Sequence, residues 1–221
     1  MSLDFERARF NMIEQQVRPW DVLDARVLDV LRTVKREDFV PARYRKMAFA
    51  DLALPVDGGE RPEVMMKPTV EGRMLQALDA SDACSILEVG TGSGFVTACL
   101  AQLGREVTSI DIEPRFVERA AGRLALAGIS NVRLEAADAL SWKPARQFDV
   151  VCITGAVAEV PESFRSWVRV GGRMFVVRGV SPAMDATLLT RVSETDYSAA
   201  SLFETDIPYL VNAAPPKRFV L

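Results

Sequence analysis

The chain has 221 residues, of which 49% are apolar and 26% are charged, and its formal net charge is −3. These values are typical of a soluble globular protein with one large domain. The acidic balance argues against a nucleic-acid partner held through its phosphates. No apolar run approaches the ~20 residues of a membrane span, and the charged start at 1–7 lacks a signal sequence. We therefore expect a cytoplasmic protein that does not enter a membrane.

The cysteine and histidine content limits the metal sites and catalytic mechanisms that the chain could support. Cys84, Cys99 and Cys152 lie far apart in apolar segments, which predicts buried, reduced thiols. The chain contains no histidine. This absence excludes His-rich zinc sites and every mechanism that needs a Ser–His or Cys–His pair, so we predict no metal site.

Residues 1–80 predict short helices separated by irregular segments. Five prolines exclude one long helix. They are Pro19, Pro41, Pro55, Pro62 and Pro68. Asp24 is expected to cap one helix at its N-terminus, and Thr69 is expected to cap another.

From residue 85 the pattern alternates between strand and helix, which predicts right-handed crossovers and a mostly parallel sheet. The expected strands are 86–89, 107–111, 131–135, 148–153 and 173–177, and the expected helices are 95–103 and 114–127. After a short linker at 179–182, antiparallel edge strands are expected at 188–192, 201–207 and 218–221. The predicted fold class is α/β: a doubly wound, Rossmann-like, seven-stranded sheet with a helical N-terminal extension and antiparallel C-terminal edge strands.

A glycine-rich turn follows the first strand of this pattern. Gly90, Gly92 and Gly94 open the helix at 95–103, and Asp111 ends the second strand 21 residues after Gly90. Glycines there allow a close approach of the backbone to a ligand, and an acid at this spacing accepts hydrogen bonds from ribose hydroxyls. The alternative is a turn that serves only helix–strand packing.

The type of nucleotide follows from the details of the turn. A dinucleotide fingerprint requires Gly-x-Gly-x-x-Gly, whereas this chain has Gly-x-Gly-x-Gly followed by Phe95. Glu88, Asp111 and Asp138 are expected to form an acidic rim. Such a rim suits the sulfonium cation of S-adenosylmethionine better than a pyrophosphate.

Several motifs resemble those of class I methyltransferases, namely 87–94, 109–111, 138–139, 147–151 and 170–173. The N-terminal half resembles one family in particular, the protein-L-isoaspartate O-methyltransferases. The residues that carry this likeness are Arg36-Glu37-Asp38-Phe39-Val40-Pro41, Ala50-Asp51, Ala53-Leu54-Pro55-Val56 and the helix start at 68–74. The likeness extends nearly from end to end, including Phe203-Glu204-Thr205.

The resemblance implies an S-adenosylmethionine-dependent enzyme that esterifies the carboxylate of L-isoaspartyl residues during protein repair. It implies one domain over 1–221, with a substrate-side region at 1–80, a cofactor-binding core at 81–180 and edge strands at 181–221. The expected cofactor-binding residues are Glu88, Gly90, Thr91, Gly92, Gly94, Phe95, Asp111, Ile112, Asp138, Ala139 and Thr154.

The chain departs from the family pattern at one segment. The family carries Thr-Ile-Ser-x-Pro, whose serine lies where cofactor and substrate meet, but this chain reads Val64-Met65-Met66-Lys67-Pro68. Met66 therefore replaces the serine, and the stretch from Pro55 to Pro68 is about three residues longer than the family pattern. Met66 either packs in the interior or marks a changed acceptor. In the second case Lys67 faces an anion, or Thr69 supplies the hydroxyl.

Three hypotheses for the function remain open on the sequence. The first is methylation of a protein or peptide carboxylate, which is ionised at neutral pH and needs no general base. The second is methylation of another small-molecule acid, hydroxyl or amine. The third is a protein that binds the cofactor with little isoaspartyl turnover because of Met66.

Overall fold

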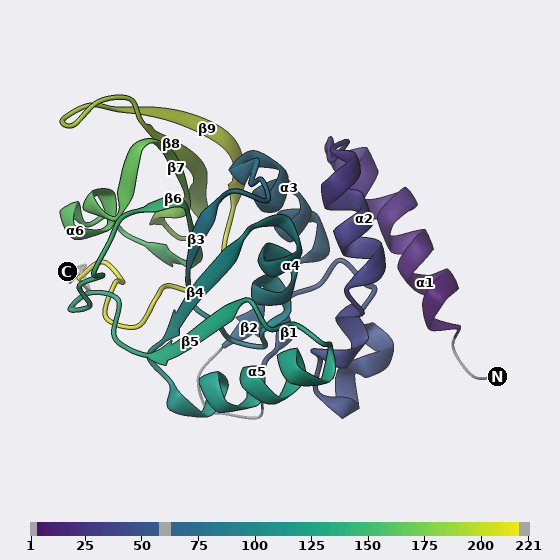
Figure 1. Cartoon of the computed structure of the whole chain (residues 1–221). Coiled ribbons are helices and arrows are strands. Elements are labelled where there is room, and N and C mark those ends of the chain that lie inside the picture. The colour runs from purple at the N-terminus through teal and green to yellow at the C-terminus, as the bar shows by residue number, and fades with distance from the viewer. Residues whose placement is uncertain (1–3, 58–62, 217–221) are drawn as a thin grey trace, which may run out of the picture.

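The computed structural model of the protein describes residues 4–57 and 63–216. At its centre lies a seven-stranded sheet in the order β5-β4-β3-β6-β7-β8-β9 (Figure 1). The strands from β5 to β7 pair in parallel, and β8 and β9 extend the sheet as antiparallel strands. Their bounds are β3 (Ser85–Val89), β4 (Glu106–Asp111), β5 (Val132–Ala136), β6 (Phe148–Val157), β7 (Val168–Val180), β8 (Ala183–Arg191) and β9 (Tyr197–Thr205). The predicted fold class is confirmed.

The N-terminal part is helical, as predicted. The α-helices of the chain are α1 (Phe5–Met12), α2 (Ala25–Thr33), α3 (Pro68–Leu78), α4 (Phe95–Leu103), α5 (Pro114–Leu126) and α6 (Glu162–Ser166). Shorter helical turns occupy Ile13–Val17, Arg18–Trp20, Arg36–Asp38 and Ala42–Met47. A small two-stranded ribbon pairs β1 (Leu54–Pro55) with β2 (Val64–Met65). The cap at Asp24 is confirmed, since its side chain accepts hydrogen bonds from the amides of Arg26 and Val27.

The two faces of the sheet are covered differently. Helices α3, α4 and α5 pack on one face, and α1 and α2 lie outside them (Figure 1). Helix α4 is buried at every residue except Gln102, which fits its predominantly apolar sequence. The other face is covered by the short helix α6 and the connection after β5, which bring Trp142, Phe164 and Trp167 together. In the described part of the chain, no helix is long and apolar enough to cross a membrane.

The later strands are longer than predicted. The prediction ended one strand at 153 and began another at 173, but β6 continues to Val157 and β7 extends from Val168 to Val180. The glycines at 155, 171 and 172 interrupt the apolar pattern and lie where the pairing of β6 with β7 shifts register, yet both strands continue beyond them. The predicted linker at 179–182 is the tight connection of the β7–β8 hairpin, in which Val180 pairs with Ala183. The strand expected at 218–221 lies outside the described residues.

The predicted cap at Thr69 is wrong. Helix α3 begins at Pro68, with Lys67 as its N-terminal cap residue, so Thr69 lies inside the first turn. Its amide and its hydroxyl both donate to the carboxylate of Asp51, at 3.2 Å and 2.8 Å. The carboxylate that binds this helix end therefore comes from a separate segment of the chain.

Candidate functional site

A cavity of about 1180 Å³ lies at the carboxyl ends of the central strands. We call it the main cavity. The winding of the sheet reverses here, because β4 lies on one side of β3 and β6 on the other. Ligands of doubly wound folds bind at such a switch point. The sequence-predicted residues that line the cavity are Gly90, Gly92, Asp111, Ile112, Asp138, Ala139 and Thr154.

The three glycines of the turn between β3 and α4 have different tasks. All three have positive φ, at +97° for Gly90, +50° for Gly92 and +85° for Gly94. A Cβ at Gly90 would lie 2.3 Å from the hydroxyl of Thr154, and one at Gly94 would lie 3.0 Å from Ala120. Those two glycines therefore allow packing within the protein. Gly92 has no described neighbour closer than 3.8 Å at this position, so it leaves room for a ligand.

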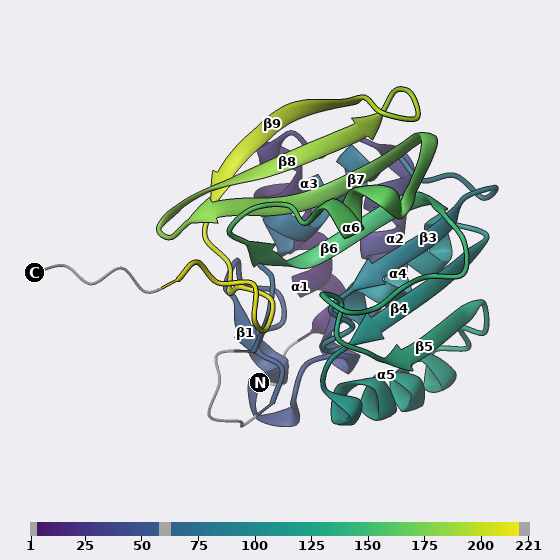
Figure 2. The same cartoon turned by 90° about the vertical axis from the view of Figure 1, so that its left-hand side faces the viewer.

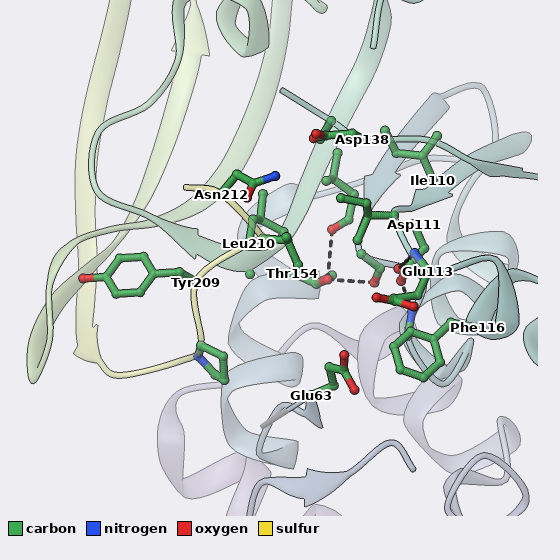
Figure 3. Close-up of a pocket in the computed structure, with 18 of the residues that line it drawn as sticks. Glu63, Ile110, Asp111, Glu113, Phe116, Asp138, Thr154, Tyr209, Leu210 and Asn212 are labelled. Carbon is green, nitrogen blue, oxygen red and sulfur yellow. Dashed lines mark hydrogen bonds between the residues drawn. The ribbon is translucent and has the colours of Figure 1, made fainter. Parts of the chain in front are cut away.

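Asp111 fixes the shape of this turn from the end of β4. One carboxylate oxygen accepts a hydrogen bond from the amide of Gly92 at 2.8 Å, and the other accepts one from the amide of Glu113 at 2.9 Å. Burial raises the pKa of Asp111, although both amide contacts oppose that shift. Figure 3 shows Asp111 and Glu113 beside Phe116 on one side of the main cavity. Each oxygen keeps lone pairs for hydroxyl donors.

The structure does not bring Glu88 to the predicted acidic rim. Its side chain is fully buried beneath the turn, where it accepts hydrogen bonds from the hydroxyls of Thr97 at 2.5 Å and Ser109 at 2.6 Å. The Ser109 hydroxyl also contacts that of Thr91 at 2.6 Å. Burial raises the pKa of Glu88 from 4.5 to about 8, so this carboxyl is mostly neutral at pH 7. Glu88 supports the turn from below.

Other predicted residues also lie outside the main cavity. Phe95 is buried 5.8 Å from the ring of Phe39, with the guanidinium of Arg36 over its face. Thr91 and Gly94 are absent from the main cavity lining too. The acids that do reach this cavity include Asp111, Asp138 and two that the prediction missed. The missed acids are Glu63 and Glu113. Glu113 lies only two positions beyond Asp111, in a turn whose direction the sequence pattern does not specify.

Among the three substrate-loop candidates, only Met66 lines the main cavity. Its side chain is buried, and its carbonyl oxygen accepts a hydrogen bond from Arg36 at 2.8 Å. Lys67 is exposed and lies outside the cavity. Thr69 is committed to Asp51, so its hydroxyl does not stand in for the missing serine.

The sequence prediction also missed the segment after β9, which closes one side of the main cavity. This segment turns back beside the end of β6 (Figure 2). Two backbone hydrogen bonds hold it to Ala156, one from Leu210 at 2.8 Å and one to Pro208 at 2.9 Å. Leu210 and Asn212 face the cavity beside Thr154 in Figure 3. The segment has no strand or helix periodicity, so no pattern in the sequence marks it.

Comparison with known proteins decides the family. A family model described as protein-L-isoaspartate(D-aspartate) O-methyltransferase matches residues 8–202. The chain belongs to this family. The protein-L-isoaspartate O-methyltransferase 1 of Rhodopseudomonas palustris (strain HaA2) is 32% identical over 200 residues, which cover 90% of this chain and 80% of the relative. Protein-L-isoaspartate O-methyltransferase 1 of Anaeromyxobacter sp. (strain Fw109-5) is 39% identical over 174 residues, covering 78% and 81%.

Two solved structures share the fold of this methyltransferase family member. One is a Plasmodium falciparum protein named as a protein-L-isoaspartate O-methyltransferase in complex with S-adenosyl-L-homocysteine. It aligns with a TM-score of 0.77 and 14% identity, over 95% of this chain and 99% of that one. A second protein-L-isoaspartate O-methyltransferase aligns with a TM-score of 0.79 and 21% identity, over 91% of this chain and 65% of that one.

The residues of this methyltransferase fit an adenosyl sulfonium cofactor. Gly92 forms a cradle that a Cβ would fill, and the Asp111 carboxylate lies next to it. The acids around the main cavity suit a cation rather than a pyrophosphate. The residues of the chain and its family therefore agree on the type of cofactor.

Proposed function

We propose that this protein binds S-adenosylmethionine in the main cavity and methylates the carboxylate of L-isoaspartyl residues in peptides or proteins. The observation that carries the proposal is the Gly92 cradle held by Asp111 at the switch point of the sheet. Family membership supports the same activity. The cofactor supplies an activated methyl group, so the protein mainly has to bind and align the two reactants.

The proposed roles on the cofactor side follow from the hydrogen bonds already made. Asp111 keeps lone pairs free for the ribose hydroxyls, while the Gly92 turn allows the cofactor to approach the backbone. Asp138 uses one oxygen to accept from the amide of Leu140 at 2.9 Å, and its other oxygen is proposed to accept from the nucleoside. Ile112, Ala139 and Leu140 supply apolar surface for the base.

The part of the main cavity proposed to bind the methyl acceptor is compatible with a carboxylate, but it also indicates slow methyl transfer. An isoaspartyl carboxylate is ionised at neutral pH, so a chain without histidine suffices. Met66 lines the main cavity at the position where the family pattern has a serine. Methionine donates no hydrogen bond, so alignment of the acceptor is expected to be poorer. Methylation of another small acid is the second candidate, and the same substitution favours it.

One assay tests the proposal directly. Labelled methyl transfer from S-adenosylmethionine is measured on an isoaspartyl peptide and on its aspartyl twin. We expect base-labile methyl ester on the isoaspartyl peptide alone. Label on both peptides, or base-stable label, would show that the acceptor is a different group. We further propose a peptide or protein partner in the cytoplasm, which cell fractionation with an antibody to the chain would test.

A further inference from the structure

A second cavity, of about 40 Å³, lies between the glycine turn and helix α3. We call it the small cavity. It shares Met66, Gly90, Gly92 and Thr154 with the main cavity, so the two adjoin. Glu71 of α3 lines the small cavity but not the main one. The volume is enough for a water molecule or an ammonium group.

Glu71 is buried, and its two oxygens differ. One of them receives the guanidinium of Arg36. The other, Oε1, has no hydrogen-bond partner among the described residues. A buried carboxylate oxygen without a donor is costly, and Glu71 also lines a cavity that adjoins the main one, so a donor group from outside can reach it.

Besides its contact with Glu71, Arg36 donates hydrogen bonds to two backbone carbonyl oxygens. Its Nε donates to the carbonyl oxygen of Ala48 at 2.9 Å, and its Nη2 donates to that of Met66 at 2.8 Å. Arg36 is thus held by three contacts, with Ala48, Met66 and Glu71. Oε1 of Glu71 cannot move far without breaking the contact with Arg36. A ligand in the small cavity therefore meets a preorganised acceptor.

We propose that Oε1 of Glu71 binds the α-ammonium group of the amino-acid part of the methyl donor. This inference rests on the proposed function, since it places the nucleoside in the main cavity and the amino-acid part past Gly92. An ammonium group offers three donors and a positive charge, which complement a carboxylate oxygen that lacks both. Glu71 would then select donors that carry a free amino group.

The proposal predicts linkage between donor binding and a proton. Burial raises the pKa of Glu71 from 4.5 to about 7, against the opposing effect of Arg36 and with a small further rise from Asp51. Cys99 also lies within electrostatic range of Glu71. A bound cation favours the ionised carboxyl, so donor affinity should rise with pH toward 8 and binding below pH 7 should release a proton.

Calorimetry with three ligands tests this on the wild-type protein. The ligands are S-adenosylhomocysteine, its analogue without the α-amino group, and 5′-methylthioadenosine, which lacks the whole amino-acid part. We expect the deaminated analogue to bind about tenfold or more weakly than S-adenosylhomocysteine, as for a lost charged hydrogen bond. Its affinity should also stay constant from pH 6 to 8, whereas that of S-adenosylhomocysteine should rise.

Variants test whether Glu71 is the residue that recognises the α-amino group. Glu71→Gln should weaken S-adenosylhomocysteine about tenfold or more, remove its pH dependence and leave 5′-methylthioadenosine unchanged. Glu37→Gln is the matched control. Glu37 is also buried and paired with Arg9, and one of its oxygens has no partner in the described part of the chain, but it lines neither the main nor the small cavity. It should bind all three ligands like wild type.

The outcomes separate this inference from the proposed function. If none of the adenosyl ligands binds wild type, the proposed function fails first. If S-adenosylhomocysteine and its deaminated analogue bind wild type equally well, the ammonium site is refuted while the function stands. That comparison needs no variant, so it decides the matter even if Glu71→Gln does not fold.

Discussion

Asp111 and Gly92 act together at the floor of the main cavity, because the carboxylate receives the amide of the glycine at 2.8 Å. Gly92→Val should abolish binding of S-adenosylhomocysteine, since a side chain at φ +50° would enter the space of the ligand. Asp111→Ala should weaken binding by about 1–3 kcal/mol, as for a lost hydrogen bond to a charged group. Calorimetry measures both.

The control for that pair is Gly122→Val, on the exposed side of α5, where an added Cβ meets nothing within 4 Å. It should bind the ligand like wild type. Unchanged affinity in Asp111→Ala would remove Asp111 from the ribose site.

A substitution of Met66 tests how this single residue affects binding of the methyl acceptor. We expect wild type to methylate an isoaspartyl peptide on the order of a hundredfold more slowly than a family member with the serine, because one aligning hydrogen bond is missing. Met66→Ser should recover part of this rate at saturating cofactor. The backbone should stay in place, since Arg36 holds the carbonyl oxygen of residue 66.

The matched control is Met65→Ser. Met65 is equally buried at 5% exposure, and it lines the small cavity but not the main one. It should lose stability as Met66→Ser does, without gaining activity. Initial rates that rise in both variants, or in neither, would contradict a role for residue 66 in aligning the acceptor.

At the scale of single elements, the start of α3 shows what a local pattern cannot supply. The sequence places a helix after Pro68 correctly but assigns the cap to Thr69, because a threonine before an apolar run is a typical cap. The carboxylate that receives the first-turn amide belongs to Asp51, 18 positions earlier. No local pattern around Thr69 indicates this distant partner.

Some residues of the site are predictable from the sequence, and others are not. Gly90, Gly92 and Asp111 follow strands whose apolar runs are clear, so their meeting at one sheet edge follows from the winding. Glu88 is part of the same motif, yet β-strand alternation turns its side chain under α4. The segment at 207–214 has no helix or strand periodicity, and its hydrogen bonds to β6 and its apolar contacts hold it beside the cavity.

The cap contributed by Asp51 can be measured. Asp51→Ala should lower the free energy of unfolding by about 1 kcal/mol, the usual value of an N-terminal cap. Thr69→Val removes only the hydroxyl and should cost less. Because the two residues share one contact, the double variant should be less destabilised than the sum of the two. Urea unfolding of the three variants decides this, and strict additivity would show that the contact contributes nothing.

At the scale of the whole molecule, residues far apart in the sequence combine to form the site. The main cavity draws its lining from Val56 near the N-terminal helices, from the central strands and from residues up to Ala214. A single apolar cluster also reaches from Met12 to Ile207. The thick layer of helices on one face buries Glu71 and Glu88 beside the cavity. The fold thus maintains Glu71 and Glu88, in addition to Asp111, as acids with raised pKa values close to the site.

Stability of the whole fold should therefore depend on pH through Glu88. Its pKa is 4.5 when unfolded and about 8 when folded, because burial disfavours the charged form. Between these values the folded state keeps a proton that the unfolded state has released. The stabilisation is complete below pH 4.5 and is lost as pH rises toward and through about 8. Glu88→Gln is neutral at every pH, so its free energy of unfolding should decline less steeply.

Urea unfolding from pH 5 to pH 8.5 measures this slope. The range stays above the acid limb expected from Asp149 and Asp185. Burial opposes their ionisation, but hydrogen bonds and nearby arginines outweigh it and lower both pKa values. Glu71→Gln should also reduce the slope, since the Glu71 pKa is raised to about 7. Glu159→Gln, at an exposed position, should keep the wild-type slope. A wild-type slope in Glu88→Gln would mean that Glu88 is ionised in the folded protein, with a cation or solvent reaching it beneath the glycine turn.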